Sequence, residues 1–105
     1  MEVESWIMAD QKGVAALLSI PLSRIPLNTD AIPRPKEFLV SLAHRSNKAG
    51  LRADLVPRPG ATSKVGPGYN LLLGEFVRLH WNIERASQVS KSLQRTLTRL
   101  GTHFP

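Results

Sequence analysis

The stretch that decides the fold runs from Asn70 to Leu100 and reads NLLLGEFVRLHWNIERASQVSKSLQRTLTRL. Its apolar residues follow one another at alternating steps of four and three, which places them along one side of an α-helix. Nine positions form this seam, and only one of them is polar: Leu72, Phe76, Leu79, Ile83, Ala86, Ser90, Leu93, Leu97 and Leu100. The spacing predicts a long C-terminal amphipathic helix over residues 70–101, with an apolar seam that needs a partner surface.

The predicted helix is long for the size of the chain. At 1.5 Å per residue it would measure about 47 Å, whereas a folded chain of this length has a radius of gyration of about 13 Å. We therefore expect the helix to kink, to project, or to run along another subunit. Leu73, Val77 and Trp81 give its first half a second apolar stripe, so that half is expected to form the hub of the core. The second half is apolar on one side only.

The residues before this helix predict two short helices joined by proline-rich segments. Asp10 can cap a first helix that continues to about Ser19, where Pro21 ends it. Four prolines between residues 21 and 35 predict an extended strap over the core. A second helix is expected from about Lys36 to Lys48, with Gly50 just past its end. Residues 51–56 fit either a short strand or a third, poor helix, and residues 57–68 a loop.

These patterns predict a mainly α fold: a small helical bundle of about three helices in a single domain spanning residues 1–105. An apolar content of 42% is typical of a folded protein. The absence of cysteine excludes a disulfide framework and a cysteine-based zinc site. No apolar run approaches the roughly 20 residues that span a bilayer, and residues 1–10 carry three acids and no base, unlike a secretory leader. We therefore expect a cytoplasmic protein with no membrane partner.

Charge is distributed unevenly along the chain. The net charge is +6, and the isoelectric point is about 10.6. From residue 85 onward there are four cations and no acid, Arg85, Lys91, Arg95 and Arg99, which gives that segment a net charge of +4. A basic segment of this kind indicates an anionic partner such as nucleic acid. The alternative interpretation is a solvated helix face that keeps the protein soluble.

The candidate nucleic-acid-binding residues lie on the predicted long helix and are Arg78, Arg85, Lys91, Arg95 and Arg99. Arg78, Trp81 and Arg85 would share a face, where a tryptophan between two arginines could stack on a base. The simpler alternative places Trp81 in the core, with the arginine stems over its edge.

The second half of the seam, Ala86, Leu93, Leu97 and Leu100, is the candidate interface for a homo-oligomer or for a larger acidic protein partner. Ser90 could select the register of such an assembly. The alternative is a helix bent back onto the core of its own chain.

No motif indicates an enzyme, a metal site or a cofactor. His80 and Glu84 are four residues apart, but two such groups do not form a site, and a helix-surface ion pair explains them. The leading hypothesis is a small, basic, oligomerising helical protein that binds nucleic acid electrostatically. The alternative is a protein–protein adaptor or assembly subunit that docks the seam on a larger partner.

Overall fold

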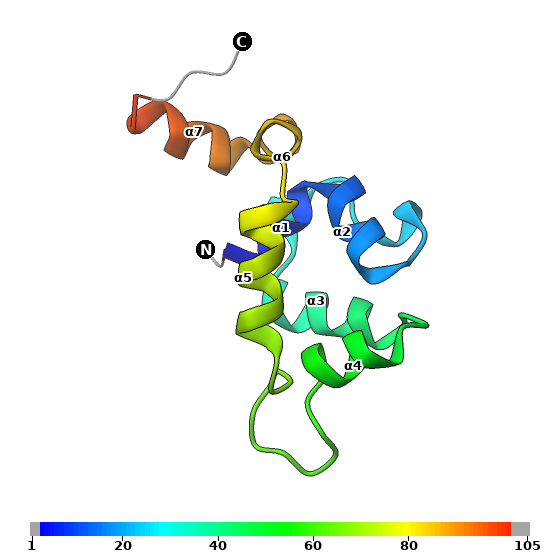
Figure 1. Cartoon of the computed structure of the whole chain (residues 1–105). Coiled ribbons are helices and arrows are strands. Elements are labelled where there is room, and N and C mark those ends of the chain that lie inside the picture. The colour runs from blue at the N-terminus through cyan, green and yellow to red at the C-terminus, as the bar shows by residue number, and fades with distance from the viewer. Residues whose placement is uncertain (1–2, 102–105) are drawn as a thin grey trace.

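The computed structural model describes residues 3–101, and this part of the chain contains helices and loops but no strand (Figure 1). The prediction of a mainly α fold is therefore confirmed. The architecture differs from a bundle of about three helices, because the described residues form seven short α-helices and two 3-10 helices. In order they are α1 (Val3–Ala9), α2 (Gln11–Leu18), η1 (Leu22–Arg24), η2 (Thr29–Ala31), α3 (Pro35–His44), α4 (Ala49–Leu55), α5 (Tyr69–Leu79), α6 (Ile83–Val89) and α7 (Lys91–Arg99).

The predicted first helix corresponds to α2, and a separate helix, α1, precedes it and meets it at Asp10. The Asp10 side chain caps α2 by accepting a hydrogen bond from the backbone N–H of Gly13 at 3.1 Å, as the sequence predicts. The same carboxylate explains the glycine, since a Cβ at Gly13 would lie 2.3 Å from Asp10 Oδ2. A residue that weakens the helix by roughly 1 kcal/mol relative to alanine is thus required by the close approach of the cap.

The middle of the chain follows the predicted order, with shifted boundaries. Residues 20–34 run as a strap that contains only the two 3-10 turns. Helix α3 ends at His44 rather than near Lys48, and Gly50 lies inside α4 instead of ending α3. Of the two alternatives for residues 51–56, the helix is correct, since α4 runs over Ala49–Leu55. The loop that follows is tied back to α4, since the N–H of Gly66 donates to the Leu55 carbonyl at 2.9 Å.

The prediction of one long helix over residues 70–101 is wrong, because the chain breaks it twice to give α5, α6 and α7. The Asn82 side chain caps α6 by accepting from the N–H of Arg85 at 2.9 Å, and Ser90 caps α7 by accepting from the N–H of Leu93 at 3.1 Å. Short polar side chains compete with the helix for backbone hydrogen bonds and favour such caps. Ser90, a seam position, and Asn82, which lies between two seam positions, therefore act as helix starts.

Two apolar clusters hold the helices together, with α1 between them. The first core joins α1–α5 and includes Met8, Leu18, Leu39, Leu55, Tyr69, Leu73 and Phe76. The second core joins α1 to α6 and α7 and consists of Ala9, Ala86 and Leu93, with Trp6, Trp81, Ile83, Val89 and Leu97 packed against it. Figure 1 shows α6 and α7 together at one end of α5, with the loop after α4 at the other end. The described residues extend over 44 × 26 × 24 Å.

Trp81 connects the two cores. Its ring packs against both clusters, and its indole N–H donates to the carbonyl oxygen of Trp6 at 3.2 Å. The structure thus agrees with the core interpretation of Trp81 rather than with a stacking platform. Leu73 is buried as expected from the second stripe, whereas Val77 remains 39% exposed.

Candidate functional site

Helix α7 is held at its first turn by a polar cluster around Asp30 of η2. The Asp30 carboxylate accepts hydrogen bonds from the hydroxyls of Ser90, at 2.7 Å, and Ser92, at 3.0 Å, and from the N–H of Ser92 at 3.1 Å. The indole N–H of Trp6 donates to the same Ser92 hydroxyl at 2.9 Å. Burial acts to raise the pKa of Asp30, but these hydrogen bonds outweigh it and the pKa lies below its ordinary value. The cluster fixes where α7 begins and how it is oriented.

The exposed face of α7 carries three of the predicted nucleic-acid-binding residues. Lys91, Arg95 and Arg99 are four residues apart, so they form one line along the helix, here called the basic stripe. All three are exposed, and α7 contains no acid. The positive charge of Arg95 also helps to lower the pKa of Asp30. Leu93 and Leu97 lie on roughly the opposite face and anchor the helix to the second core.

The other two predicted cations do not join this stripe. Arg78 is exposed in the last turn of α5, beside a groove between α1 and α5. Helix α5 ends at Leu79. The single helix face that the sequence predicts for Arg78, Trp81 and Arg85 therefore does not exist. Arg85 belongs to α6 and turns toward Asp10.

The Arg85 side chain has a partner within the chain. Its Nε donates to Asp10 Oδ1 at 2.7 Å and its Nη2 donates to Asp10 Oδ2 at 3.2 Å. Asp10 is fully buried, whereas the Arg85 side chain is 44% exposed. Burial acts to raise the pKa of Asp10, but the bonds from Arg85 and from the N–H groups of Asn82 and Gly13 outweigh it and lower the pKa. The hydrogen bond with Asp10 raises the pKa of Arg85. Arg85 therefore has a structural role, as the partner of a buried carboxylate, in addition to any phosphate contact.

The predicted partner interface is partly occupied by the chain itself. Ala86 is fully buried and Leu93 is 2% exposed, both in the second core, so neither presents a surface to another molecule. Leu97 is half-buried and Leu100 is 74% exposed. The interpretation of a helix folded back on its own chain therefore describes this part of the seam, except at its last position.

Beside Leu97 and Leu100, the structure has an apolar groove between α1, the end of α5, α6 and α7. Its volume is about 250 Å³, and its lining includes Val3, Trp6, Val77, Leu97 and Leu100. Apart from the hydroxyl-bearing Thr96, the lining consists of large apolar residues. This groove contains the two positions in the second half of the seam that remain accessible, Leu97 and Leu100.

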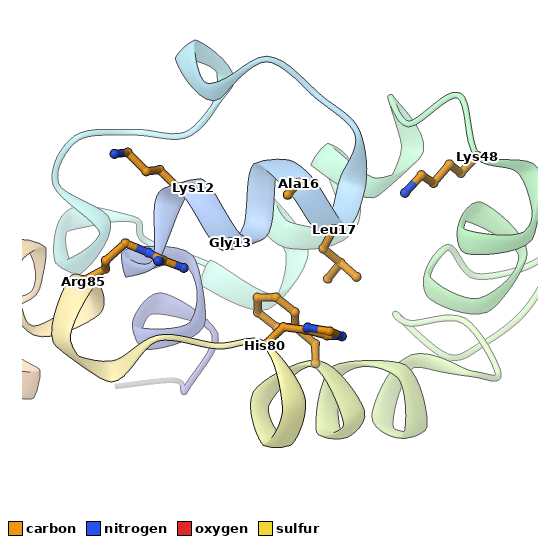
Figure 2. A pocket seen from close by; sticks show the side chains of 8 residues that line it. Lys12, Gly13, Ala16, Leu17, Lys48, His80 and Arg85 are labelled. Atoms are coloured by element: carbon orange, nitrogen blue, oxygen red, sulfur yellow. The ribbon is translucent and has the colours of Figure 1, made fainter.

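A second hollow, here called the basic pocket, lies where α2, α5 and α6 approach the start of α4. Its volume is about 450 Å³, and Figure 2 shows the side chains that line it. They are Lys12, Gly13, Ala16, Leu17, Lys48, Phe76, His80 and Arg85. The sequence does not predict this group, because its cations are far apart along the chain and the break between α5 and α6, which the predicted long helix lacks, places His80 and Arg85 beside α2. The predicted surface pair of His80 with Glu84 is divided between the end of α5 and α6.

Two further features of the described residues bear on function. Within residues 3–101, no three His, Cys, Asp or Glu side chains gather closely enough to hold a metal ion. In the same range, no helix combines the length and hydrophobicity needed to cross a bilayer.

Comparisons with models of known protein families, with curated proteins and with solved structures find no significant match. Function therefore has to be inferred from the residues themselves.

Proposed function

We propose that the protein binds nucleic acid through the basic stripe of α7, Lys91, Arg95 and Arg99. The proposal rests on the difference between the two faces of α7. The apolar face is anchored in the second core, and the exposed face has cations but no acid. Successive cations are about 6 Å apart along the helix axis. Phosphates of one strand of B-DNA are about 3.4 Å apart along its axis, so each cation would meet roughly every second phosphate.

Binding of this kind is electrostatic and reads no base sequence. Three phosphate contacts predict a slope of about −2.7 in a plot of log affinity against log salt concentration. Affinity should therefore fall about 40-fold between roughly 50 mM and 200 mM salt. Arg85 is left out of this set because it lies on α6, away from the stripe on α7, and two of its three guanidinium nitrogens already bond to Asp10.

The test is a fluorescence anisotropy titration of a labelled, random-sequence duplex over a range of salt concentrations. A variant with Lys91→Gln, Arg95→Gln and Arg99→Gln should bind at least tenfold more weakly and lose most of the salt slope. A matched control, Arg24→Gln with Arg45→Gln and Arg58→Gln, removes the same charge from exposed positions outside α7. Equal loss in both variants would contradict a localised site. Substituting Arg85 as well would spoil the test, because it would leave the buried carboxylate of Asp10 without its cation.

The apolar groove supports a second candidate function, that of an adaptor which receives an amphipathic helix from an acidic protein partner. An exposed leucine beside a groove lined with apolar side chains suits the helix-in-groove mode of recognition. Arg78 borders the adjoining groove between α1 and α5, which shares Val3 and Val77 with the first, so an acidic flank on the partner would face a cation.

The two functions respond differently to salt and to mutation. Leu100→Asp should abolish docking in the groove and leave nucleic-acid affinity within about threefold, since it adds one exposed charge. The groove could instead be occupied by a second copy of this chain. Light scattering at low and high salt would then give a doubled mass, and Leu100→Asp would return it to that of the monomer.

A further inference from the structure

We propose that the basic pocket binds a small organic phosphate, with the phosphoryl group between Lys12 and Arg85 and a flat apolar body against Leu17 and the exposed His80 ring. This site shares no residue with the basic stripe of α7, so it is independent of the proposed nucleic-acid binding. A volume of about 450 Å³ lies in the range of about 300–1,000 Å³ that small-molecule sites occupy.

The charge of the pocket favours an anion. Lys12, Lys48 and Arg85 contribute cations from three different elements, and no carboxylate is part of the lining. Asp10, which pairs with the lining residue Arg85, is fully buried and accepts hydrogen bonds from Arg85, Asn82 and Gly13. An anion that enters the pocket therefore meets cations at its wall and no exposed carboxylate in the lining.

Asp10 also prepares Arg85 for this role. It uses the Nε and Nη2 atoms of the guanidinium, which leaves the Nη1 group out of the pair. The remaining edge is held at a fixed orientation before any ligand arrives, and a fixed orientation lowers the entropy lost on binding. Arginine donates in a planar fork that matches phosphate, and a second cation nearby suits a dianion better than a single carboxylate.

The floor of the pocket is apolar. Figure 2 shows Lys12 and Arg85 toward one end and Lys48 at the other, with Leu17 and His80 between them. Phe76 also lines this floor, and its ring centroid is 6.5 Å from that of His80, with the two planes tilted by 33°. A ligand with a phosphoryl group at one end, a flat ring in the middle and an acceptor for Lys48 at the far end fits this order of side chains.

The test is a titration of the ¹⁵N-labelled protein with adenosine 5′-monophosphate, followed by two-dimensional NMR. We expect saturable shifts of the amides of Gly13, Ala16, Leu17 and Lys48. Adenosine and inorganic phosphate are titrated separately, and each should bind at least tenfold more weakly than the nucleotide. Equal binding of inorganic phosphate and the nucleotide would overturn the proposal, because the apolar floor would then contribute nothing.

Three variants locate the site without touching the structural ion pair. Lys12→Gln and Lys48→Gln should each weaken nucleotide binding about fivefold or more, as expected for loss of one charge-assisted hydrogen bond. Lys91→Gln removes the same charge from α7 and should leave nucleotide affinity unchanged. Unchanged affinity in the first two variants, or shifts confined to α7, would refute the site. If the protein fails to bind duplex DNA but these nucleotide shifts occur, only the proposed nucleic-acid function is wrong.

Discussion

Replacing Asp10 with alanine should be among the most damaging single substitutions in this protein. The carboxylate caps α2 through the N–H of Gly13, accepts the N–H of Asn82 at the start of α6, and pairs with Arg85. Loss of an N-cap costs about 1 kcal/mol, and a buried N–H left without a partner costs about 1–3 kcal/mol. The ion pair adds only a few tenths to about 1 kcal/mol, because water reaches Arg85. Together these predict a loss of about 3 kcal/mol.

The measurement is urea unfolding followed by far-UV circular dichroism. A loss of about 3 kcal/mol is a large share of the roughly 5–15 kcal/mol that stabilises a typical domain. Glu75→Ala is the matched control, since it removes an acid from an exposed position on α5 and should change stability by less than about 0.5 kcal/mol. If Asp10→Ala lowers the free energy of unfolding by no more than the control does, the junction does not depend on this carboxylate.

Acidification offers an independent check on the same residue. The folded pKa of Asp10 lies below its ordinary value of about 3.9, so the unfolded chain binds a proton first as the pH falls. The stabilisation from Asp10 is therefore complete well above pH 3.9 and is lost as the pH falls toward the lower folded pKa. In the Asp10→Ala variant, the free energy of unfolding should lack this part of its pH dependence and keep the part that comes from Asp30. An identical acid profile in both proteins would refute the assignment.

Three further substitutions follow from the packing. Gly74→Ala, in an open position on α5, should stabilise the protein by about 0.5–1 kcal/mol in urea unfolding, and a loss would contradict the exposed helical setting. Gly66→Ala should instead destabilise it in the same assay, because a Cβ there would lie 2.4 Å from the Asp54 carbonyl oxygen. Ser90→Ala removes the cap of α7 and a donor to Asp30, so it should cost about 1–2 kcal/mol; amide hydrogen exchange should quicken in α7 and not in α3.

The sequence predicts the fold best where a signal is local. The Asp10 cap, the start of α3 near Lys36 and the start of α5 beside Asn70 are all predicted to within one residue, since each depends on residues within one helical turn. The long helix is predicted wrongly because its heptad spacing is continuous across Asn82 and Ser90. Whether such residues cap a new helix or sit within an old one depends on tertiary partners, here Asp10 and Asp30, which lie 72 and 60 positions away.

The candidate site is predictable to a similar extent. Spacing alone places Lys91, Arg95 and Arg99 on one face of α7, and the structure keeps them there and exposed. The sequence cannot reveal that Arg85 pairs with Asp10, because charged residues usually lie on the surface and nothing local marks Asp10 as buried. Nor can it reveal the basic pocket, whose lining comes from three helices and the residue before a fourth.

The contacts between α1 and the α6–α7 pair also impose an order of events in time. Asp10 and Arg85 are 75 positions apart, and Trp6 and Ser92 are 86 apart. At about 5–20 residues per second, a ribosome needs roughly 4–15 s to make the arginine after the aspartate. Throughout that interval the Asp10 carboxylate has no Arg85 to pair with, and the Trp6 indole has no Ser92 hydroxyl to bond. The second core can therefore form only after α6 and α7 have been synthesised, since it needs Ala86 and Leu93 as well as Ala9.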